Sequence, residues 1–526
     1  MAFGRIRALD TLRPTICRMG MRRWAVRFGP AVALLLLLMP GRAAPSTSSG
    51  ANSGQHLAAQ PNRAPKPPPT PQAGLLRHET VSEALRAFLN GFVQPPSSYS
   101  PVPIWWWSGE RLDPARLEWQ LDRMREGHIY NTVVLNLAPT GPLYGSQPDD
   151  PPFFSERWWA ILRRVLERAR SRGMRVWLYD QLGFSTARIQ ERLMEREPAW
   201  RAQELRVVEQ DVQGPITVRM HAPGRAVAAC AVRLNTEGRP EPPIAHISSS
   251  LTAGHLQKQL PEGRWRVMLF YETPGGFDYM SRWAAGKLLN FVHGEFERKL
   301  GKYLGSTIPG TFQDELPPMN RWTRRFLEEF RKRKGYDLRP YLPMLWYDLG
   351  PKTAMVRCHV ADVRSTLLEE AFFKPLYEWH QRHGMICSYD QMTRDADPIE
   401  GSRMYGDYMR TMRWFQAPGN DQTGLSRPHS SLAHLYRRPR VWLEGFYNSG
   451  WGQTLEELSQ RIHEFYAQGS NLYNPHAWYY TTLGGWWEWA PPCTSFRQPY
   501  WRHYPLFADY VSRLSYGLSR GSHACD

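Results

Sequence analysis

The chain has 526 residues, of which 42% are hydrophobic and 13% aromatic, and its formal net charge is +17. This length exceeds the roughly 250 residues of a plain α/β barrel, so it leaves room for a further folded part. The basic residues show no nucleic-acid-binding motif, and six Cys without a CxxC pair argue against a zinc site, a redox pair and a dense disulfide framework.

Residues 1–44 have the layout of a secretory signal peptide. A basic region at 21–27 precedes an apolar run at 31–39, and the small residues of 41–44 offer a cleavage site. The apolar run is too short to cross a bilayer as a helix. We therefore expect an exported protein, periplasmic or extracellular, with no membrane span in the mature chain. A retained signal anchor is the alternative.

Residues 45–75 are rich in Pro, Ser, Gly and Ala, which predicts a disordered linker. Strand and helix patterns then alternate over residues 76–202. Apolar runs predict strands at 101–107, 130–137 and 174–180. Amphipathic spacing predicts helices at 112–127, capped by Asp113, and at 155–173, capped by Ser155.

Residues 203–275 change to period-two alternation without long helical runs, which predicts an inserted β domain. The strand–helix pattern resumes over residues 276–526. It predicts strands at 308–315, 385–390, 441–446 and 471–476, with an eighth near 405–414, and helices at 279–304, 320–334, 355–383, 430–436 and 455–468. Repeated strand–helix units indicate an α/β fold with parallel strands. A (β/α)8 TIM barrel fits better than a doubly wound sheet, because no G-x-G-x-x-G follows the first strand.

Acidic residues end several of the predicted strands, and the C-terminal ends of barrel strands are where TIM-barrel enzymes hold their reactive groups. These acids are Asp180, Asp314, Glu315, Asp390 and Glu444. One such acid alone would more often cap a helix or pair with an Arg. Several acids in register predict a polar cleft, and a pair of carboxyls, one protonated and one ionised, is what glycoside hydrolysis requires. The charge of Asp314 would help to keep the neighbouring Glu315 protonated.

Aromatic and imidazole side chains near the strand ends are candidates for sugar contacts, because flat apolar rings stack on sugar rings. They are Trp106, His476 and Trp487; the alternative for each is a packing role. Strand alternation sends Trp106 to the face opposite its two Trp neighbours. Four further acids between residues 390 and 425 are either turn formers or calcium ligands, and we favour turns; they are Asp395, Asp397, Asp407 and Asp421.

Several longer motifs together resemble the α-L-rhamnosidases of glycoside hydrolase family 106 and their uncharacterised relatives. The motifs are residues 103–109, the Gln-Leu pair of the first helix, and residues 336–343, 405–408, 413–421, 433–436, 441–446 and 484–492. The resemblance runs from about residue 80 to the end of the chain. It is specific for the superfamily and not for the substrate.

The resemblance implies a (β/α)8 catalytic domain, inversion at the anomeric carbon, calcium at the site, and two glutamates: Glu315 as general acid and Glu444 as general base. It also implies that the C-terminal β domains of those relatives are absent, because the chain stops at Asp526. We therefore expect a glycosidase acting on α-L-rhamnoside or similar deoxy-sugar linkages in an oligo- or polysaccharide. A non-catalytic or truncated carbohydrate-binding relative is the alternative.

Overall fold

The computed structural model of the chain describes residues 5–8, 78–136, 149–184, 187–319, 321–390, 398–483 and 491–521. Two compact units divide the chain: residues 1–10 together with 83–526, and residues 11–82. Helix α1 (His78–Val93) crosses the boundary between them. Everything below concerns the larger unit. Within the described residues, no helix combines the length and the apolar character that crossing a bilayer would require.

Short, buried, parallel strands form the centre of this unit. One sheet has the order β11-β10-β4-β3-β2-β15, with every neighbouring pair parallel. Its strands are β2 (Ile104–Trp106), β3 (Asn131–Leu135), β4 (Arg175–Tyr179), β10 (Gly310–Gln313), β11 (Ile386–Tyr389) and β15 (Trp478–Tyr479). A second parallel sheet has the order β12-β13-β14. Its strands are β12 (Gly419–Asn420), β13 (Trp442–Gly445) and β14 (Leu472–Pro475).

Backbone hydrogen bonds link the two sheets at both of their ends. Ser388 of β11 and Ala417, in the segment before β12, form a parallel bridge. Ala417 N donates to Cys387 O at 3.1 Å. Between β14 and the residues before β2, Val102 N donates to Tyr473 O at 2.9 Å. These bonds join β11 to the segment before β12, and β14 to the segment before β2.

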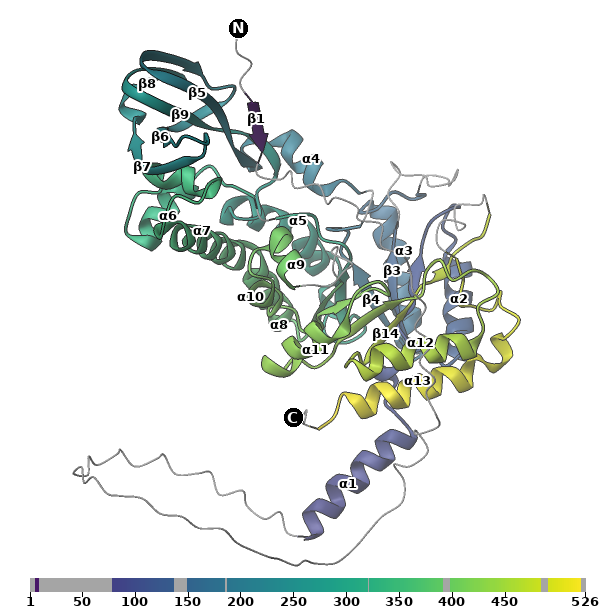
Figure 1. Cartoon of the computed structure of the whole chain (residues 1–526). Helices are drawn as coiled ribbons and strands as arrows, with labels where there is room; N and C mark the ends of the chain where they lie inside the picture. The colour runs from purple at the N-terminus through teal and green to yellow at the C-terminus, as the bar shows by residue number, and fades with distance from the viewer. Residues whose placement is uncertain are drawn as a thin grey trace, which may run out of the picture. The chain divides into compact units, whose positions relative to one another are not determined.

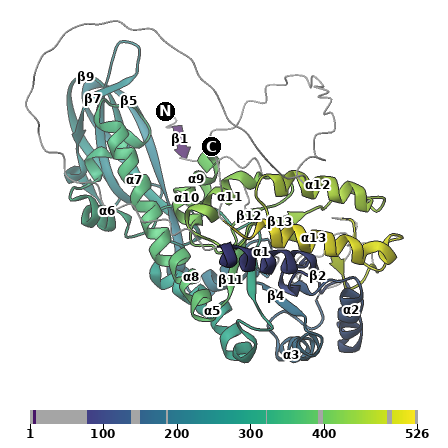
Figure 2. The same ribbon diagram turned by 90° about the horizontal axis from the view of Figure 1, so that it is seen from below.

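Helices that follow the strands pack around them (Figures 1 and 2). Asp113 accepts a hydrogen bond from Ala115 N and begins α2, while Ser155 accepts one from Trp158 N and begins α3, as predicted. The helices are α2 (Pro114–Glu126), α3 (Glu156–Ser171), α4 (Ile189–Arg196), α5 (Arg282–Leu300), α6 (Phe326–Lys334), α7 (Lys352–Leu368), α8 (Lys374–Arg382), α9 (Pro398–Tyr405), α10 (Tyr408–Met412), α11 (Ser426–Leu435), α12 (Leu455–Ala467) and α13 (Tyr504–Leu518).

Alternation along the strands divides the core into two clusters. The inner cluster contains Trp106, Trp177, Tyr179, Phe312 and Trp442. Their sequence neighbours point the other way and pack in the cluster that the helices cover, which includes Trp105, Trp107, Val176 and Leu178. The prediction that Trp106 faces away from its two Trp neighbours is confirmed.

An antiparallel sheet of order β1-β5-β9-β6-β7 covers the region where period-two alternation predicts strands. Its strands are β1 (Arg5–Ala8), β5 (Arg201–His221), β6 (Arg225–Leu234), β7 (Pro240–His246) and β9 (His255–Phe277), and β8 (Leu251–Thr252) pairs with β9. The sheet lies beside α6 and α7 (Figures 1 and 2), where Trp322 Nε1 donates to Glu272 Oε1 at 2.8 Å. It has a separate apolar core, formed by residues such as Val218, Val267 and Leu269.

Two predictions about elements are wrong. The stretch 405–414 is not a strand: it contains the end of α9 and all of α10, because Asp407 caps a turn whose Tyr408, Thr411 and Met412 share one buried face. The missing strand is the two-residue β12. The predicted helix 355–383 is interrupted by a π-helical turn at Glu369–Phe373 between α7 and α8.

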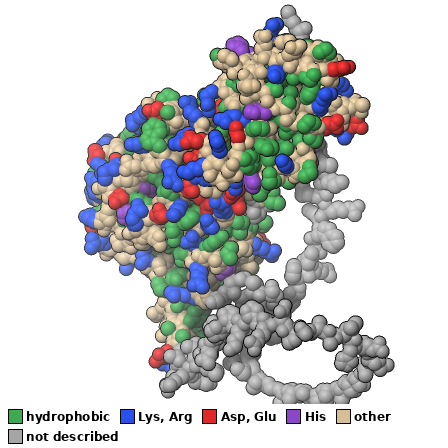
Figure 3. Space-filling view, turned by 90° about the vertical axis from the view of Figure 1, so that its left-hand side faces the viewer, with side chains coloured by type: hydrophobic (Ala, Val, Ile, Leu, Met, Phe, Trp, Pro, Cys, Tyr) green, Lys and Arg blue, Asp and Glu red, His purple; other side chains and the backbone are tan. Residues whose placement is uncertain are grey.

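The surface carries charges of both signs. Figure 3 shows Lys and Arg side chains interspersed with acids over one face of the molecule. Ion pairs in the described chain include Arg266 with Asp211 at 2.7 Å and Arg282 with Glu370 at 2.7 Å.

Candidate active site

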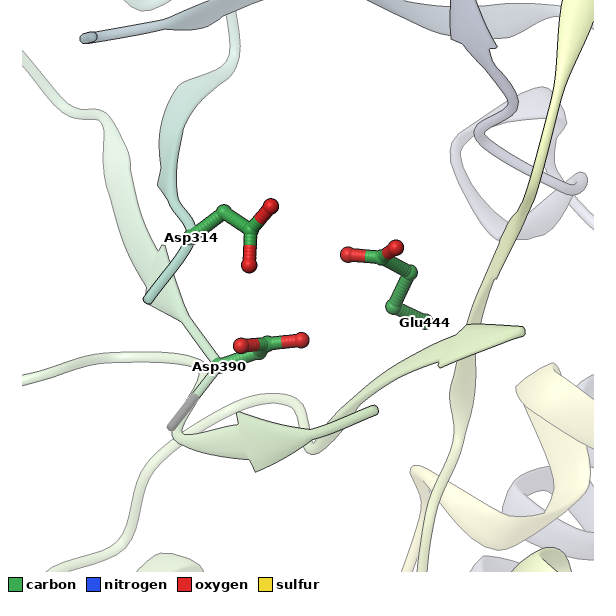
Figure 4. Close-up of side chains that lie close together, drawn as sticks. All are labelled: Asp314, Asp390 and Glu444. Carbon is green, nitrogen blue, oxygen red and sulfur yellow. The ribbon is translucent and has the colours of Figure 1, made fainter. Parts of the chain in front are cut away.

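Three buried carboxylates face one another where three parallel strands end. Asp314 follows β10, Asp390 follows β11, and Glu444 lies in β13. One oxygen from each lies within 4.8 Å of the other two. Figure 4 shows the three side chains pointing toward a common point. Their side chains are almost fully buried, with exposures of 8%, 1% and 5%. We call these residues the carboxylate triad.

Strand alternation explains why the triad converges. Asp314 is two residues after Phe312 and Glu444 is two residues after Trp442, and both aromatic residues point into the inner cluster. Asp390 follows Tyr389, which packs on the helix side, so Asp390 takes the inner side. Side chains two apart in a strand share a face. The three acids are thus brought to the inner side by the same alternation that packs the barrel-like core.

Burial and mutual repulsion raise the pKa values of the triad. Burial, followed by the charge of Glu315, raises the pKa of Asp314 to about 7. Burial and the charge of Asp314 raise the pKa of Asp390 and of Glu444 well above the ordinary range for carboxyl groups. Both oxygens of Asp390 and Oε2 of Glu444 accept no hydrogen bond from the described residues. The three acids of the triad therefore tend to retain protons near neutral pH.

Tyr179 and the loop after β4 hold Asp314 in place. Tyr179 Oη donates to Asp314 Oδ2 at 2.6 Å, which favours the ionised carboxylate. Phe184 N donates to the backbone oxygen of Asp314 at 2.7 Å. Gly183 lies so close that an added Cβ would be 1.6 Å from that same oxygen. Only glycine fits at this contact.

Glu315 follows Asp314 in a left-handed backbone conformation, with φ of 45°. Non-glycine residues adopt this region at a cost of about 1–3 kcal/mol, and such residues are concentrated at functional sites. The Glu315 side chain is partly exposed, and its charge raises the pKa of Asp314, Asp390 and Glu444. Glu315 therefore lies beside the triad without being buried in it.

The structure does not bring Asp180 into the triad. Asp180 follows Tyr179, an inward residue, so its side chain points toward the helices. It accepts hydrogen bonds from Leu182 N at 3.0 Å and from Gln313 Nε2, and it lies 3.8 Å from His293 Nε2 on α5. Burial raises its pKa to about 7. Asp180 therefore lies on the helix side of β4 and β10. The structure does not place it beside the triad, so its predicted contact with substrate stays a prediction.

Asp421 joins the site although the sequence favoured a turn for it. It follows β12 directly, is 5% exposed, and its charge raises the pKa of all three triad residues. Its carboxylate accepts hydrogen bonds from Thr423 N at 2.7 Å and from Tyr447 Oη at 2.8 Å. Asp407 caps α10, as the turn interpretation expects. Asp395 and Asp397 lie outside the described residues.

Aromatic and imidazole side chains lie beside the strand ends. The rings of Trp106 and His476 are 5.4 Å apart, and those of His476 and Tyr447 are 5.8 Å apart. Because Tyr447 also binds Asp421, these rings connect to the acidic residues. The structure brings Trp106 and His476 together, while Trp487 lies outside the described residues.

The triad has the chemistry of a cation site. Three carboxylates converge, and both oxygens of Asp390 and Oε2 of Glu444 accept no hydrogen bond from the described residues, so their ionised forms would lack compensation. Hard cations such as Ca²⁺ take carboxylate oxygens as ligands. The donor set therefore fits the calcium ion that the sequence resemblance implies.

Comparisons with known proteins agree with this geometry. The sequence model of a family described as alpha-L-rhamnosidase matches residues 244–526, which is more than half of the chain. A curated relative from Formosa agariphila, with the name "Putative beta-glucuronidase", is 24% identical over 310 residues, covering 54% of this chain and 26% of that protein.

Among solved structures, a rhamnosidase from Novosphingobium sp. PP1Y superimposes with a TM-score of 0.62 at 13% sequence identity. The match covers 83% of this chain and 61% of that one. At this identity the likeness concerns the fold alone. The chain spans about a quarter of the curated relative and about three fifths of the solved structure.

Proposed function

Because the chain belongs to the alpha-L-rhamnosidase family, known as glycoside hydrolase family 106, we propose that it hydrolyses glycosidic bonds. The observation that carries the proposal is the convergence of three buried carboxylates at the C-terminal ends of parallel strands, next to Glu315. Parallel α/β barrels hold their reactive groups at this end of the strands.

We infer that the two parallel sheets form one (β/α)8 barrel. The strands in order are β2, β3, β4, β10, β11, β12, β13 and β14. Two sets of hydrogen bonds support closure: Ala417 N to Cys387 O between β11 and the β12 segment, and Val102 N to Tyr473 O between β14 and the β2 segment. The antiparallel sheet, which falls between β4 and β10 in the sequence, would then be an inserted β domain over residues 203–275.

In the proposed reaction, Glu315 donates a proton to the leaving oxygen and Glu444 removes one from the attacking water, with inversion at the anomeric carbon. Partial exposure suits Glu315, because the leaving group must depart toward solvent. Glu444, buried among acids, needs compensation of their charge in order to act as a base.

The carboxylates of Asp314 and Asp390, with Glu444 adjacent, are the residues that would hold a calcium ion. When bound, the ion would supply positive charge that favours the ionised forms of these acids. Asp421 accepts hydrogen bonds from Thr423 and Tyr447, so we assign it to the charge around the site and not to the ion's ligands.

We propose that the substrate is an oligo- or polysaccharide carrying a terminal α-L-rhamnosyl or similar deoxy-sugar. The methyl group and the ring carbons of such a sugar are apolar, and Trp106, His476 and Tyr447 offer rings next to the acids. Export of the protein rests on the pattern of residues 1–44 alone.

The test uses aryl glycosides, with α-L-rhamnoside and β-D-glucuronide among them, and follows release of the aryl alcohol. We expect Glu315→Gln and Glu444→Gln each to lower kcat by at least about 10³-fold while sugar binding, measured calorimetrically, persists. Glu464→Gln, on the exposed surface of α12, is the matched control and should keep wild-type kcat. Binding by the wild type without turnover of any glycoside would favour the non-catalytic alternative.

The stereochemical part has a separate readout. Proton NMR of the sugar released in the first minutes of the reaction distinguishes inversion from retention, because the anomer formed first differs. A first product with the anomeric configuration of the substrate would refute inversion while leaving hydrolysis intact.

A further inference from the structure

A cavity of about 370 Å³ opens at the opposite end of the parallel strands from the carboxylate triad. It is lined by the residues that begin or precede strands: Arg175 begins β4, Pro309 precedes β10, Ile386 begins β11, and Arg440 precedes β13. Trp177, a member of the inner apolar cluster, also lines the cavity.

Three Arg side chains line this cavity, Arg175, Arg440 and Arg520, and no Asp or Glu is among its described lining residues. Some partly buried Arg residues elsewhere in the described chain are paired with acids; Arg410, for example, pairs with Asp362 at 2.6 Å. The described wall of this cavity carries positive charge without an acidic residue of its own.

Arg440 is the most deeply placed of the three, with 7% exposure. Its guanidinium donates to Asn471 O at 2.7 Å, to Asn471 Oδ1 at 3.3 Å and to Ser98 O at 3.4 Å, all of them neutral acceptors. No carboxylate of the described residues lies within 4.0 Å of it. Burial lowers its pKa to about 10. A buried, hydrogen-bonded charge without a partner is costly, and an anion would compensate it.

Arg175 and Arg520 add two further charges around the same space. Nη1 of Arg175 is buried and makes no hydrogen bond within the described structure. Arg520 lies over the Tyr99 ring, with Cζ at 5.9 Å from the ring centroid, and Arg440 lies over the same ring at 4.7 Å. Both guanidiniums thus contact the Tyr99 ring, and the unpaired donor of Arg175 adds a third group suited to an oxyanion.

We propose that this cavity, which we call the arginine pocket, binds a small oxyanion of the phosphate or sulfate class. Guanidinium groups match the oxygens of such anions geometrically as well as in charge. The size suits an inorganic ion with its hydration water. The inference is independent of the proposed glycosidase activity, because the pocket lies at the other end of the strands.

The test is calorimetric titration of the full-length protein with sodium phosphate at pH 7, against sodium chloride of equal ionic strength. Arg175→Gln is the informative variant, because this side chain makes no hydrogen bond within the described residues that folding would lose. We expect its Kd for phosphate to rise at least about tenfold. Arg331→Gln, on the exposed end of α6, removes the same charge elsewhere and should bind phosphate as the wild type does.

Thermal unfolding gives a second readout, in which the difference in Tm between Arg175→Gln and wild type should change sign when phosphate is added. Without phosphate, Arg175→Gln should have a Tm equal to or above that of the wild type, because it relieves repulsion among three like charges. With phosphate in excess, the order should reverse, because only the wild type gains stability by binding. Absence of phosphate binding to the wild type, or equal binding by Arg175→Gln and wild type, would overturn the proposal.

Discussion

Replacing Asp180 with Asn tests whether this acid supports the fold or contacts substrate. Its carboxylate is fully buried, accepts hydrogen bonds from Leu182 N and Gln313 Nε2, and lies 3.8 Å from a buried His293. Asn keeps the oxygen that Leu182 needs. Its amide would donate to Gln313 once the Gln313 amide rotates, and Gln313 Oε1 makes no hydrogen bond within the described structure. The substitution should therefore be accommodated without a cavity.

The expected effect on stability depends on pH. The pKa of Asp180 is about 7 in the folded chain and 3.8 for an ordinary aspartate, so the folded state binds more protons between these values. Stability from this group is present below pH about 4 and is lost as pH rises through about 7. The full difference corresponds to about 4 kcal/mol, and about 2–3 kcal/mol of it develops between pH 5 and pH 8.

Urea unfolding of wild type and Asp180→Asn at both pH values measures this difference. We compare the free energy of unfolding of the variant minus that of wild type at the two pH values. This difference should be about 2–3 kcal/mol larger at pH 8 than at pH 5. Asp348→Asn, at an exposed turn, is the control and should show no such dependence. Turnover by Asp180→Asn should stay near wild type. A pH-independent difference, or loss of turnover with stability intact, would refute the reasoning.

Other substitutions probe the site itself. Tyr179→Phe removes the 2.6 Å hydrogen bond to Asp314, so the pKa of Asp314 should rise. The acidic limb of the pH–rate profile should then move up by about one pH unit. An unchanged profile would contradict the role assigned to Tyr179. Gly183→Ala should lower kcat and cost about 1–3 kcal/mol of stability, because the new Cβ meets a backbone oxygen. The control Gly286→Ala in α5 should stabilise the protein by about 0.5–1 kcal/mol. Equal denaturation midpoints for the two variants would count against the close contact at Gly183. The Tm of wild type should be higher in calcium than in EDTA, and Asp390→Asn should lose most of that increase. A full increase in Tm for Asp390→Asn would exclude Asp390 as a calcium ligand.

The sequence carried enough information to place the strands and three of the acids. Val, Ile, Leu and Trp runs that stop on Asp or Glu predicted β4, β10, β11 and β13 to within a few residues. Applying strand parity to the acids would also have separated Asp314 from Asp180. Asp314 lies two residues after an inward aromatic, while Asp180 lies one residue after one. The same parity places Trp106 opposite its two Trp neighbours.

Other features had no adequate local signal. Strand β12 has only two residues, Gly419 and Asn420, between a proline and an aspartate, so its pattern is that of a turn. It forms because neighbouring strands supply hydrogen-bond partners on both sides. Asp421 was consequently assigned to a turn. Glu315 adopts a left-handed conformation next to the close contact between Gly183 and the backbone of Asp314, which are far apart in sequence.

The hydrogen bond from Asn474 Nδ2 to Val102 O joins residues separated by 372 positions. At roughly 5–20 residues per second, a ribosome needs on the order of 20–70 s to make the second partner after the first. During that interval the Trp-rich segment around β2 lacks the neighbour that later covers one of its edges. Unpaired apolar strand edges invite intermolecular pairing. We therefore expect the nascent chain to depend on chaperone protection of this segment until the final strand has emerged.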